Sequence, residues 1–261
     1  MIVIKFGGHA MVDETGNFAK AIEAAQKMGE TVVVVHGGGP QIDQGLKAAG
    51  ITSEFIGGFR VTSPDVFAVV EAVLAGEDGP SIAHTLNDFG IKAQAISGRT
   101  LPTFIAKKRN SLVDGTKVDL GLVGDVVSVD TSAIMTLVRE NVVPVLSPIA
   151  ADIESDKGLN VNADFAAAAV AGALDASVLI IMTDVQGIYR NWPDKSSLIA
   201  EICAEELASL KSTFSQGMAP KVQAALDAIA HGAKAVRIID GTDPESFAAA
   251  LSGTGGTLVV A

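Results

Sequence analysis

Two lysines lie beside glycine-containing turns near opposite ends of the chain. Lys5 ends an apolar run and precedes Gly7-Gly8, and Lys221 directly follows Pro220. A lysine at the carboxyl end of a strand points into the crevice where open α/β sheets bind ligands. Pro220 places Lys221 in a first helical turn, where the helix dipole disfavours a cation, so its position suggests a function. Both positions indicate a site for a polyanion such as phosphate. A solvated lysine is the alternative for each.

A second apolar run, Thr31 to Val35, leads into the glycine-rich segment His36-Gly37-Gly38-Gly39-Pro40. Because glycine lacks a Cβ atom, backbone N–H groups in such a turn can close around phosphate oxygens. A helix that begins just after the turn adds the positive end of its dipole. The segment therefore predicts an anion-binding loop. We expect His36 to order this loop through hydrogen bonds rather than to act as a base.

The segment Asn160-Val161-Asn162-Ala163-Asp164 combines two amides with a carboxylate. Asn162 can cap a helix that begins at Ala163, with Asp164 in its first turn. Capping alone would account for Asn162 and Asp164 but leaves Asn160 unexplained. Asn160 is therefore predicted to donate a hydrogen bond to a ligand in front of the helix.

Arg60 follows Gly57-Gly58-Phe59 in a region that predicts a β-hairpin. The planar guanidinium suits bidentate capture of a carboxylate. A solvated hairpin arginine is the alternative interpretation.

Apolar, β-branched runs alternate with alanine-rich segments along the chain. Most runs are continuous, which is typical of strands buried on both faces. The predicted strands are Ile2–Phe6, Thr31–Val35, Ile91–Ile96, Val142–Leu146, Val178–Met182, Ala235–Ile239 and Thr257–Val260. The predicted helices are Phe18–Met28, Pro40–Ala49, Pro64–Leu74, Ser81–Phe89, Thr131–Glu140, Ala163–Ala173, Ala219–His231 and Pro244–Leu251. The alternation predicts an α/β fold, a three-layer αβα sandwich around a mainly parallel, open, twisted sheet.

Two regions interrupt this alternation. Residues 52–62 and 100–129 contain turn residues and short extended pieces, and they predict β-hairpins that decorate the sheet. Gly187–Ser197 predicts an exposed loop. No flexible linker or internal repeat divides the chain, so we expect a single domain over 1–261, with a lobe boundary near residue 175.

Composition excludes several classes of protein. The net charge of −11 argues against general binding of nucleic acids or anionic membranes. Cys203 is the single cysteine, which leaves no internal disulfide and no metal-type cysteine spacing, and it is predicted to be a passive packing residue. Met1 leads directly into a strand and no apolar run reaches the roughly 18 residues of a membrane span. A cytoplasmic protein is expected.

Several nucleotide-binding and catalytic motifs are absent from the sequence. The Walker spacing G-x-x-x-x-G-K-[ST] does not occur, and neither do the H-R-D and D-F-G motifs of protein kinases. Neither glycine turn fits G-x-G-x-x-G, which weakens the interpretation as a dinucleotide-binding oxidoreductase.

With these residues in view, the chain resembles the amino acid kinase family over essentially its whole length, Ile2 to Val260. Within that family it is similar to the members that phosphorylate N-acetyl-L-glutamate in arginine biosynthesis. Six ordered segments with matching spacing carry the resemblance, and together they are highly specific. They are Lys5–Met11, Val35–Ile42, Gly58–Thr62, Asn160–Asp164, Thr183–Gly187 and Gly217–Lys221.

The resemblance implies roles for individual residues. It implies that Lys5 and Lys221 stabilise the transferring phosphoryl group and that Asp164 holds both lysines in place. An Asp164→Asn chain should then fold normally yet turn over slowly. The implied contacts to acetylglutamate are Gly38, Gly39, Arg60 and Asn160, with Arg60 and Asn160 on the α-carboxylate. The implied contacts to the nucleotide are Gly8, Gly37, Asp184, Gly187, Tyr189, Thr213 and Ser215.

The resemblance also implies ATP with Mg²⁺, the metal held mainly by the nucleotide phosphates and not by protein ligands. It assigns residues 1–174 to an acceptor lobe and residues 175–261 to a nucleotide lobe. Two departures are present. Gln216 replaces a glycine common in the second lysine motif, and the helical extension of arginine-inhibited members is missing before the first strand. A homodimer with weak or absent arginine inhibition is expected.

Three alternatives stay open at this point. The first is a kinase of the homologous acid N-acetyl-aminoadipate, from lysine biosynthesis. The two acceptors differ by one methylene, which gives a discrimination free energy of only about 1–3 kcal/mol. Carbamate or UMP kinases fit less well because their acceptor segments differ from Gly58–Thr62. A non-catalytic small-molecule sensor on the same fold would not require Lys5, Lys221 and Asp164 together, yet all three are present.

Overall fold

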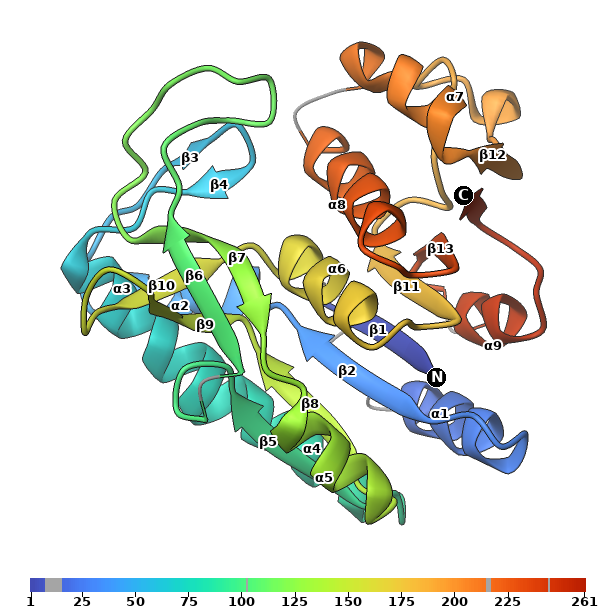
Figure 1. The fold of residues 1–261 in the computed structure, drawn as a ribbon, viewed down its shortest axis with the longest axis horizontal. Helices are drawn as coiled ribbons and strands as arrows, with labels where there is room; N and C mark the ends of the chain where they lie inside the picture. The colour runs from blue at the N-terminus through green and yellow to red at the C-terminus, as the bar shows by residue number, and fades with distance from the viewer. Residues whose placement is uncertain (8–15, 102, 215–216, 244) are drawn as a thin grey trace.

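The protein is built on one open, twisted sheet with helices on both faces (Figure 1). The computed structural model describes residues 1–7, 16–101, 103–214, 217–243 and 245–261. Over these residues the sheet has eight strands, and only β13 and β14 pair antiparallel. In spatial order they are β12 (Glu201–Cys203), β14 (Thr257–Val260), β13 (Ala235–Asp240), β11 (Val178–Thr183), β1 (Ile2–Phe6), β2 (Val32–His36), β8 (Val143–Ser147) and β5 (Ala93–Ser97). The predicted fold class is confirmed.

Side-chain alternation along the strands creates two separate cores. Val3 and Leu179 face one side of the sheet, whereas Ile4 and Ile180 face the other. The first side is covered by α5 (Ser132–Arg139), α6 (Ala163–Ala173) and α8 (Ala219–Ala230). The second side is covered by α1 (Asn17–Lys27), α4 (Gly79–Asp88) and α9 (Ser246–Leu251). Because both faces are covered, β1, β2, β8 and β11 are buried along nearly their whole length rather than on alternate residues.

Helices α6 and α8 pack unusually closely because their facing residues are small. Ala167 and Ala171 in α6 and Ala224 and Ala228 in α8 are buried. A Cβ atom at Gly172 would lie only 2.6 Å from the Cβ atom of His231, the residue after α8. The small residues therefore let the two helices pack closely, and Asp164 and Lys221 in their first turns form an ion pair of 3.0 Å.

A small closed barrel stands beside the main sheet. It consists of β6 (Phe104–Lys108), β7 (Val123–Val129), β9 (Ile149–Asp152) and β10 (Gly158–Val161). The antiparallel pairing of β6 and β7 confirms the predicted hairpin within residues 100–129. The sequence interpretation missed β9 and β10 because each is only four residues long and the two are separated by polar turn residues. The hairpin β3 (Phe55–Ile56) and β4 (Phe59–Arg60) confirms the prediction for residues 52–62.

The helices predicted at Pro64–Leu74 and Ser81–Phe89 are joined in the structure. Helix α3 (Pro64–Glu71) continues through a π-helical segment, Ala72–Asp78, directly into α4. Pro80 has no N–H, so a regular ladder of hydrogen bonds cannot pass through it. The wider π turns carry the chain across this position without a loop. Helix α2 (Gly39–Ala48) packs against α3 and the π-helical segment.

Two further predictions are wrong in detail. Cys203 is exposed rather than a packing residue, because β12 buries only its middle residue, Ile202. Its Sγ atom instead accepts a hydrogen bond from Glu206 N and caps α7 (Ala204–Ser209), a helix that the sequence pattern did not reveal. In the loop Gly187–Ser197, Trp192 is exposed as predicted, but Ile188 and Tyr189 are buried.

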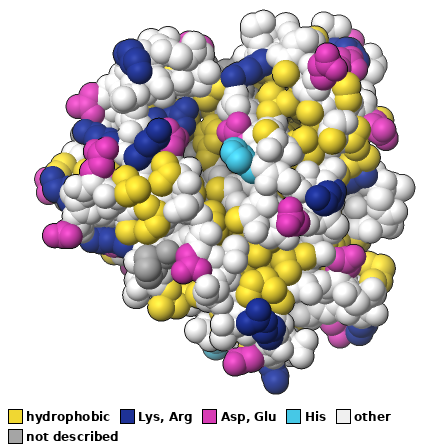
Figure 2. Space-filling model, viewed as in Figure 1, with side chains coloured by type: hydrophobic (Ala, Val, Ile, Leu, Met, Phe, Trp, Pro, Cys, Tyr) yellow, Lys and Arg dark blue, Asp and Glu magenta, His cyan; other side chains and the backbone are white. Residues whose placement is uncertain are grey.

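Among the helices described, none combines the length and apolarity needed to span a bilayer. On the face drawn in Figure 2, lysine and arginine side chains are interspersed with aspartate and glutamate.

Candidate active site

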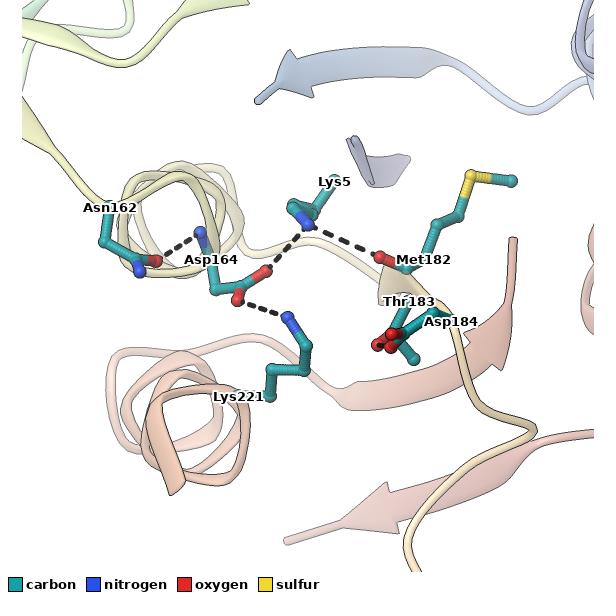
Figure 3. A network of polar contacts seen from close by, with 7 residues as sticks. All are labelled: Lys5, Asn162, Asp164, Met182, Thr183, Asp184 and Lys221. Atoms are coloured by element: carbon teal, nitrogen blue, oxygen red, sulfur yellow. Dashed lines mark hydrogen bonds and ion pairs between the residues drawn. The ribbon is translucent and has the colours of Figure 1, made fainter. Parts of the chain in front are cut away.

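Three elements bring Lys5, Asp164 and Lys221 together at the carboxyl edge of the sheet (Figure 3). Lys5 comes from β1, Asp164 from the start of α6, and Lys221 from the start of α8. Lys221 Nζ lies 3.0 Å from Asp164 Oδ2, and Lys5 Nζ lies 3.2 Å from Asp164 Oδ1. One carboxylate thus bridges two ammonium groups.

Local structure fixes each of these side chains. Asn162 caps α6, because its Oδ1 atom accepts a hydrogen bond from Asp164 N at 2.9 Å, as the sequence predicted. Pro220 lies in the first turn of α8, which leaves Lys221 as its third residue. The Lys5 ammonium donates to Met182 O at the end of β11, 3.4 Å away. A Cβ atom at position 7 would lie 3.1 Å from Lys5 Nζ, so Gly7 makes room for the folded-back lysine.

The charged groups at this point shift one another's pKa values. Burial would raise the pKa of Asp164, but the ammonium groups of Lys221 and Lys5 outweigh burial and lower it to about 2. Burial lowers the pKa of the deeper Lys5, whereas Asp164 raises that of Lys221, which is nearer to solvent. The two ammonium groups share the Asp164 carboxylate, and Asp184 is near enough to raise the pKa of both. Ammonium N–H groups that are not directed at Asp164 can donate to an anionic ligand.

A cavity of about 270 Å³ opens beside the two lysines. Its size suits a small organic acid rather than a macromolecule, and its wall combines cations, backbone and apolar side chains. The wall includes Lys5, Gly37, Gly38, Gly39, Ile42, Phe55, Phe59, Arg60, Leu74, Asn160, Asp164 and Lys221.

Arg60 is buried in the wall of this cavity with its guanidinium already oriented. Its Nη2 atom lies 2.8 Å from Asp43 Oδ1 on α2 and 3.5 Å from Gly39 O. The guanidinium also stacks on Phe55, 4.5 Å from the ring centroid. Within the described part of the chain, these polar contacts use Nη2 only, so the guanidinium keeps further N–H donors.

Asn160 is held next to Arg60 through Thr62. Asn160 Nδ2 donates to Thr62 Oγ1 at 3.1 Å, and Thr62 Oγ1 donates to Arg60 O at 2.7 Å. The fully buried Thr62 therefore ties β10 to the strand that carries Arg60. This connection sets the distance between the two predicted ligands of a carboxylate.

The glycine-rich loop lies at the end of β2 and begins α2. Gly37 N donates to Phe6 O at 2.7 Å, so a phosphate could use this N–H only if that bond were exchanged. Gly38 and Gly39 line the cavity. The N–H groups in the first turn of a helix have no partner within it and point outward, which suits an anion.

His36 orders the loop from beneath, in agreement with the sequence interpretation. Its Nδ1 atom lies 2.8 Å from Gly37 O, and its Nε2 atom lies 3.0 Å from Ser147 Oγ. Burial lowers the pKa of His36 to about 4, so the ring is neutral at pH 7. His36 has no access to the cavity as a general base.

The predicted nucleotide contacts are only partly brought together. Asp184 follows β11, accepts from Thr183 Oγ1 at 3.0 Å, and lies close enough to raise the pKa of both lysines. Gly187 packs against Thr257, Tyr189 donates to Gln186 Oε1, and Thr213 donates to Leu210 O. These three do not line the cavity around the lysines. The predicted contacts Gly8 and Ser215 lie outside the described residues.

Sequence reasoning missed Asp43 and Phe55, which orient Arg60. Asp43 lies four positions after Gly39 and so on the same face of α2, a spacing that could have indicated it. Phe55 gave no such signal, because its contact depends on the twist of the β3–β4 hairpin. Among the described residues, no group of three or more histidine, cysteine, aspartate or glutamate side chains could hold a metal ion.

Comparisons with known proteins give matches over nearly the whole chain. A model of the amino acid kinase family matches residues 1–240. An acetylglutamate kinase of Bifidobacterium animalis subsp. lactis is 46% identical over 249 residues, covering 94% of this chain and 82% of that protein. An acetylglutamate kinase of Kineococcus radiotolerans is 43% identical over 270 residues, covering 100% of this chain and 90% of that protein.

A solved structure shares the fold. An N-acetylglutamate synthase of Neisseria gonorrhoeae, complexed with coenzyme A and N-acetyl-glutamate, superposes with a TM-score of 0.83 at 25% identity. The match covers 100% of this chain and 59% of that one.

Proposed function

The chain belongs to the amino acid kinase family, and from this premise we propose that it phosphorylates the side-chain carboxylate of N-acetyl-L-glutamate with ATP. The product is N-acetyl-L-glutamyl 5-phosphate, and the reaction belongs to arginine biosynthesis. The observation that carries the proposal is the Lys5–Asp164–Lys221 bridge beside a cavity with an arginine in its wall. The identity to acetylglutamate kinases over nearly the whole chain supports it.

The acceptor needs no general base. The side-chain carboxyl group has a pKa near 4.3 and is ionised at pH 7. This agrees with a site in which His36 is buried and neutral. The difficulty is to bring a carboxylate oxygen close to a phosphate that is itself negative, and positioning and charge stabilisation overcome it.

The two lysines supply this stabilisation. Lys221 at the opening and Lys5 at the base of the site can contact the oxygens of the phosphoryl group as charge shifts to the leaving ADP. Asp164 keeps both ammonium groups in place, which reduces the rotamer entropy lost when they bind. Its low pKa keeps it ionised, so it orients the lysines and does not transfer protons.

Arg60 and Asn160 are assigned to the α-carboxylate. Arg60 is stacked on Phe55 and paired with Asp43, so little ordering remains to be lost on binding. The apolar part of the cavity wall, including Ile42 and Leu74, suits the methylenes and the acetyl methyl group.

Mg²⁺ is assigned to the nucleotide rather than to a protein site. The described residues offer no cluster of metal ligands, although Asp184 lies near the lysines and could contact a hydrated ion. When bound to the phosphates, the metal neutralises part of their charge. Gly8, Gly37, Gly187, Tyr189, Thr213 and Ser215 stay predicted nucleotide contacts, as does the division into lobes near residue 175.

The decisive experiment is a coupled ADP-release assay with N-acetyl-L-glutamate, N-acetyl-aminoadipate, glutamate and aspartate side by side. We expect the highest kcat/KM with N-acetyl-L-glutamate. A preference for N-acetyl-aminoadipate would assign the enzyme to the homologous acid, and binding of acetylglutamate without ADP release would indicate a sensor.

The homodimer and the weak response to arginine stay predictions. Light scattering of the purified protein would test the first. Titration of arginine into the ADP-release assay would test the second, and half-inhibition at micromolar arginine would contradict it.

A further inference from the structure

Asp78, the last residue of the π-helical segment, packs directly behind the glycine-rich loop. A Cβ atom at Gly38 would lie 2.3 Å from Asp78 Oδ2 and 2.5 Å from Leu74 Cδ2, so the carboxyl group contacts the loop backbone. Asp78 Oδ2 is buried and has no hydrogen-bond partner in the described part of the chain. Asp78 does not line the cavity, so it can influence a ligand only through the loop.

Among the described residues, no cation offsets this carboxyl group. Burial, with a smaller contribution from Glu77, raises the pKa of Asp78 to about 7. At the end of β2, His36 is buried and neutral. The remaining charged groups of the elements packed around Asp78 are engaged or exposed. On α2, Asp43 pairs with Arg60 and Lys47 is exposed. On α3, Asp65 is exposed and Glu71 pairs with Arg99. On α4, His84 lies near Asp88.

The charge of Asp78 acts on the same end of α2 as an anionic ligand would. Gly38 is the cap of α2, whose amino-terminal end carries a partial positive charge. An ionised Asp78 behind Gly38 cancels part of that charge, whereas a protonated Asp78 leaves it for the ligand.

We propose that Asp78 is a positioning residue for the acceptor, and that its charge sets the affinity of the Gly38–Gly39 loop for an anionic acid. The inference rests on the proposed function for the identity of that acid. It adds a determinant of affinity that lies outside the cavity.

The test compares wild-type protein with Asp78→Asn and with Glu77→Gln, a matched control on the same segment. The KM for N-acetyl-L-glutamate is measured from pH 6 to pH 8.5 at saturating MgATP. Both carboxyl groups of the acceptor are ionised throughout this range. From pH 6 to pH 8, the KM of wild type should rise roughly two- to fivefold more than the KM of Asp78→Asn. This factor is the expected effect of one charge near a helix terminus on the binding of an anion. Glu77→Gln should keep the pH-dependent rise of wild type, with its midpoint at slightly lower pH because Glu77 contributes to the raised pKa of Asp78.

Parallel pH profiles for wild type and Asp78→Asn would overturn the inference, as would equal flattening by Glu77→Gln. A second measurement does not depend on catalysis. In protein labelled with ¹⁵N-glycine, the Gly38 and Gly39 amide signals should shift with a midpoint near pH 7 in wild type but not in Asp78→Asn. Absence of acetylglutamate phosphorylation in all variants would refute the proposed function, while the amide titration would still decide whether Asp78 acts on the loop.

Discussion

Asp164 lies between two ammonium groups that come from opposite ends of the chain. The sequence indicated Lys5, Lys221 and Asp164 separately, from a strand end, a first helical turn and a capping segment. The structure adds that the carboxylate contacts both lysines, at 3.2 and 3.0 Å. This arrangement makes separate predictions for catalysis and for stability.

Lys5→Ala and Lys221→Ala should each lower kcat on the order of 10³-fold while changing KM far less, because each removes a cation that acts on the transferring phosphoryl group. Steady-state ADP release measures both constants. Lys234→Ala removes an exposed lysine next to β13 and serves as the control. Near-normal turnover in either site variant would refute the assigned role of that lysine.

Asp164→Asn should lower both turnover and stability, in contrast to the expectation of normal folding from sequence alone. Removing one partner of a buried ion pair leaves uncompensated charge, which costs roughly 3 kcal/mol. Because the folded-state pKa of Asp164 is lowered to about 2, its contribution is complete above the unfolded value of 3.8 and is lost as pH falls through 2. The difference from wild type should therefore be constant near pH 7 and shrink at pH 3.

Urea unfolding followed by the fluorescence of Trp192, the single tryptophan, measures this difference. Asp65→Asn is the matched control, because Asp65 occupies the same position in α3 as Asp164 in α6 but is exposed. It should cost less than about 1 kcal/mol. Equal losses for the two variants would reduce Asp164 to a helix-dipole role.

Arg60→Lys should raise the KM for N-acetyl-L-glutamate roughly tenfold or more and leave the KM for ATP unchanged. A lysine keeps the charge but loses the planar fork that binds a carboxylate through two N–H groups. Arg99→Lys is the control, since Arg99 also pairs with a carboxylate, that of Glu71, and lies over a phenyl ring, that of Phe67. It lies outside the cavity. An effect of Arg60→Lys confined to ATP would remove Arg60 from the acceptor site.

At the scale of elements, the approach of Gly121 to Thr62 connects the hairpin to the barrel. Thr62 N donates to Leu120 O and Leu122 N donates to Thr62 O, and a Cβ atom at Gly121 would lie 2.2 Å from Thr62 O. This contact holds the strand that carries Arg60 against the segment leading into β7. Only glycine permits this short distance, because a Cβ atom at position 121 would clash with the backbone of Thr62, which cannot move aside as a flexible side chain could.

Gly121→Ala should therefore destabilise the protein and raise the KM for acetylglutamate, because Arg60 and Asn160 would lose their fixed spacing. Gly115→Ala provides a strict comparison. Both glycines have positive φ, 72° and 88°, but a Cβ atom at Gly115 meets nothing within 4 Å. Urea unfolding and the KM for acetylglutamate are measured for both variants. The additional loss of stability and the additional rise in KM in Gly121→Ala, compared with Gly115→Ala, give the effect of the close contact with Thr62. Equal effects would show that backbone strain alone is responsible.

Element prediction succeeded where local pattern and burial agree. The central strands of the main sheet, β1, β2, β8 and β11, are continuous, largely apolar runs, and their predicted positions are confirmed. Short β9 and β10 were missed, and the two helices around Ala72–Asp78 were separated wrongly. A four-residue strand carries too little periodicity to be recognised. The π-helical path depends on packing against α2 as well as on its own sequence.

At the scale of the whole molecule, the site depends on segments distributed along the entire chain. Lys5, Arg60, Asp164 and Lys221 all line one cavity. A ligand bound there therefore stabilises the entire folded arrangement and not a local segment.

N-acetyl-L-glutamate and MgADP should each raise the melting temperature by roughly 5–10 °C at about 100 times its Kd value. Saturation at that level is worth about 2.7 kcal/mol per ligand, and a chain of this size gains about 2–4 °C per kcal/mol. Differential scanning fluorimetry measures the shift. Arg60→Ala should lose the response to acetylglutamate but keep that to MgADP. Loss of both responses would place Arg60 in a structural role shared by the two sites.

The amino-acid sequence by itself determined the alternation of strands and helices, the glycine-rich loop and the residue types for phosphoryl transfer. These features reside in neighbouring residues, where periodicity, capping and turn chemistry act. Tertiary structure alone decided that one carboxylate bridges both lysines, that Asp43 and Phe55 orient Arg60, and that Gly37 N–H is engaged by Phe6 O. It also decided that Asp78 Oδ2 lies behind Gly38 with no hydrogen-bond partner among the residues that the structure describes. Such contacts depend on strand register and helix packing between distant segments, and no local pattern encodes them.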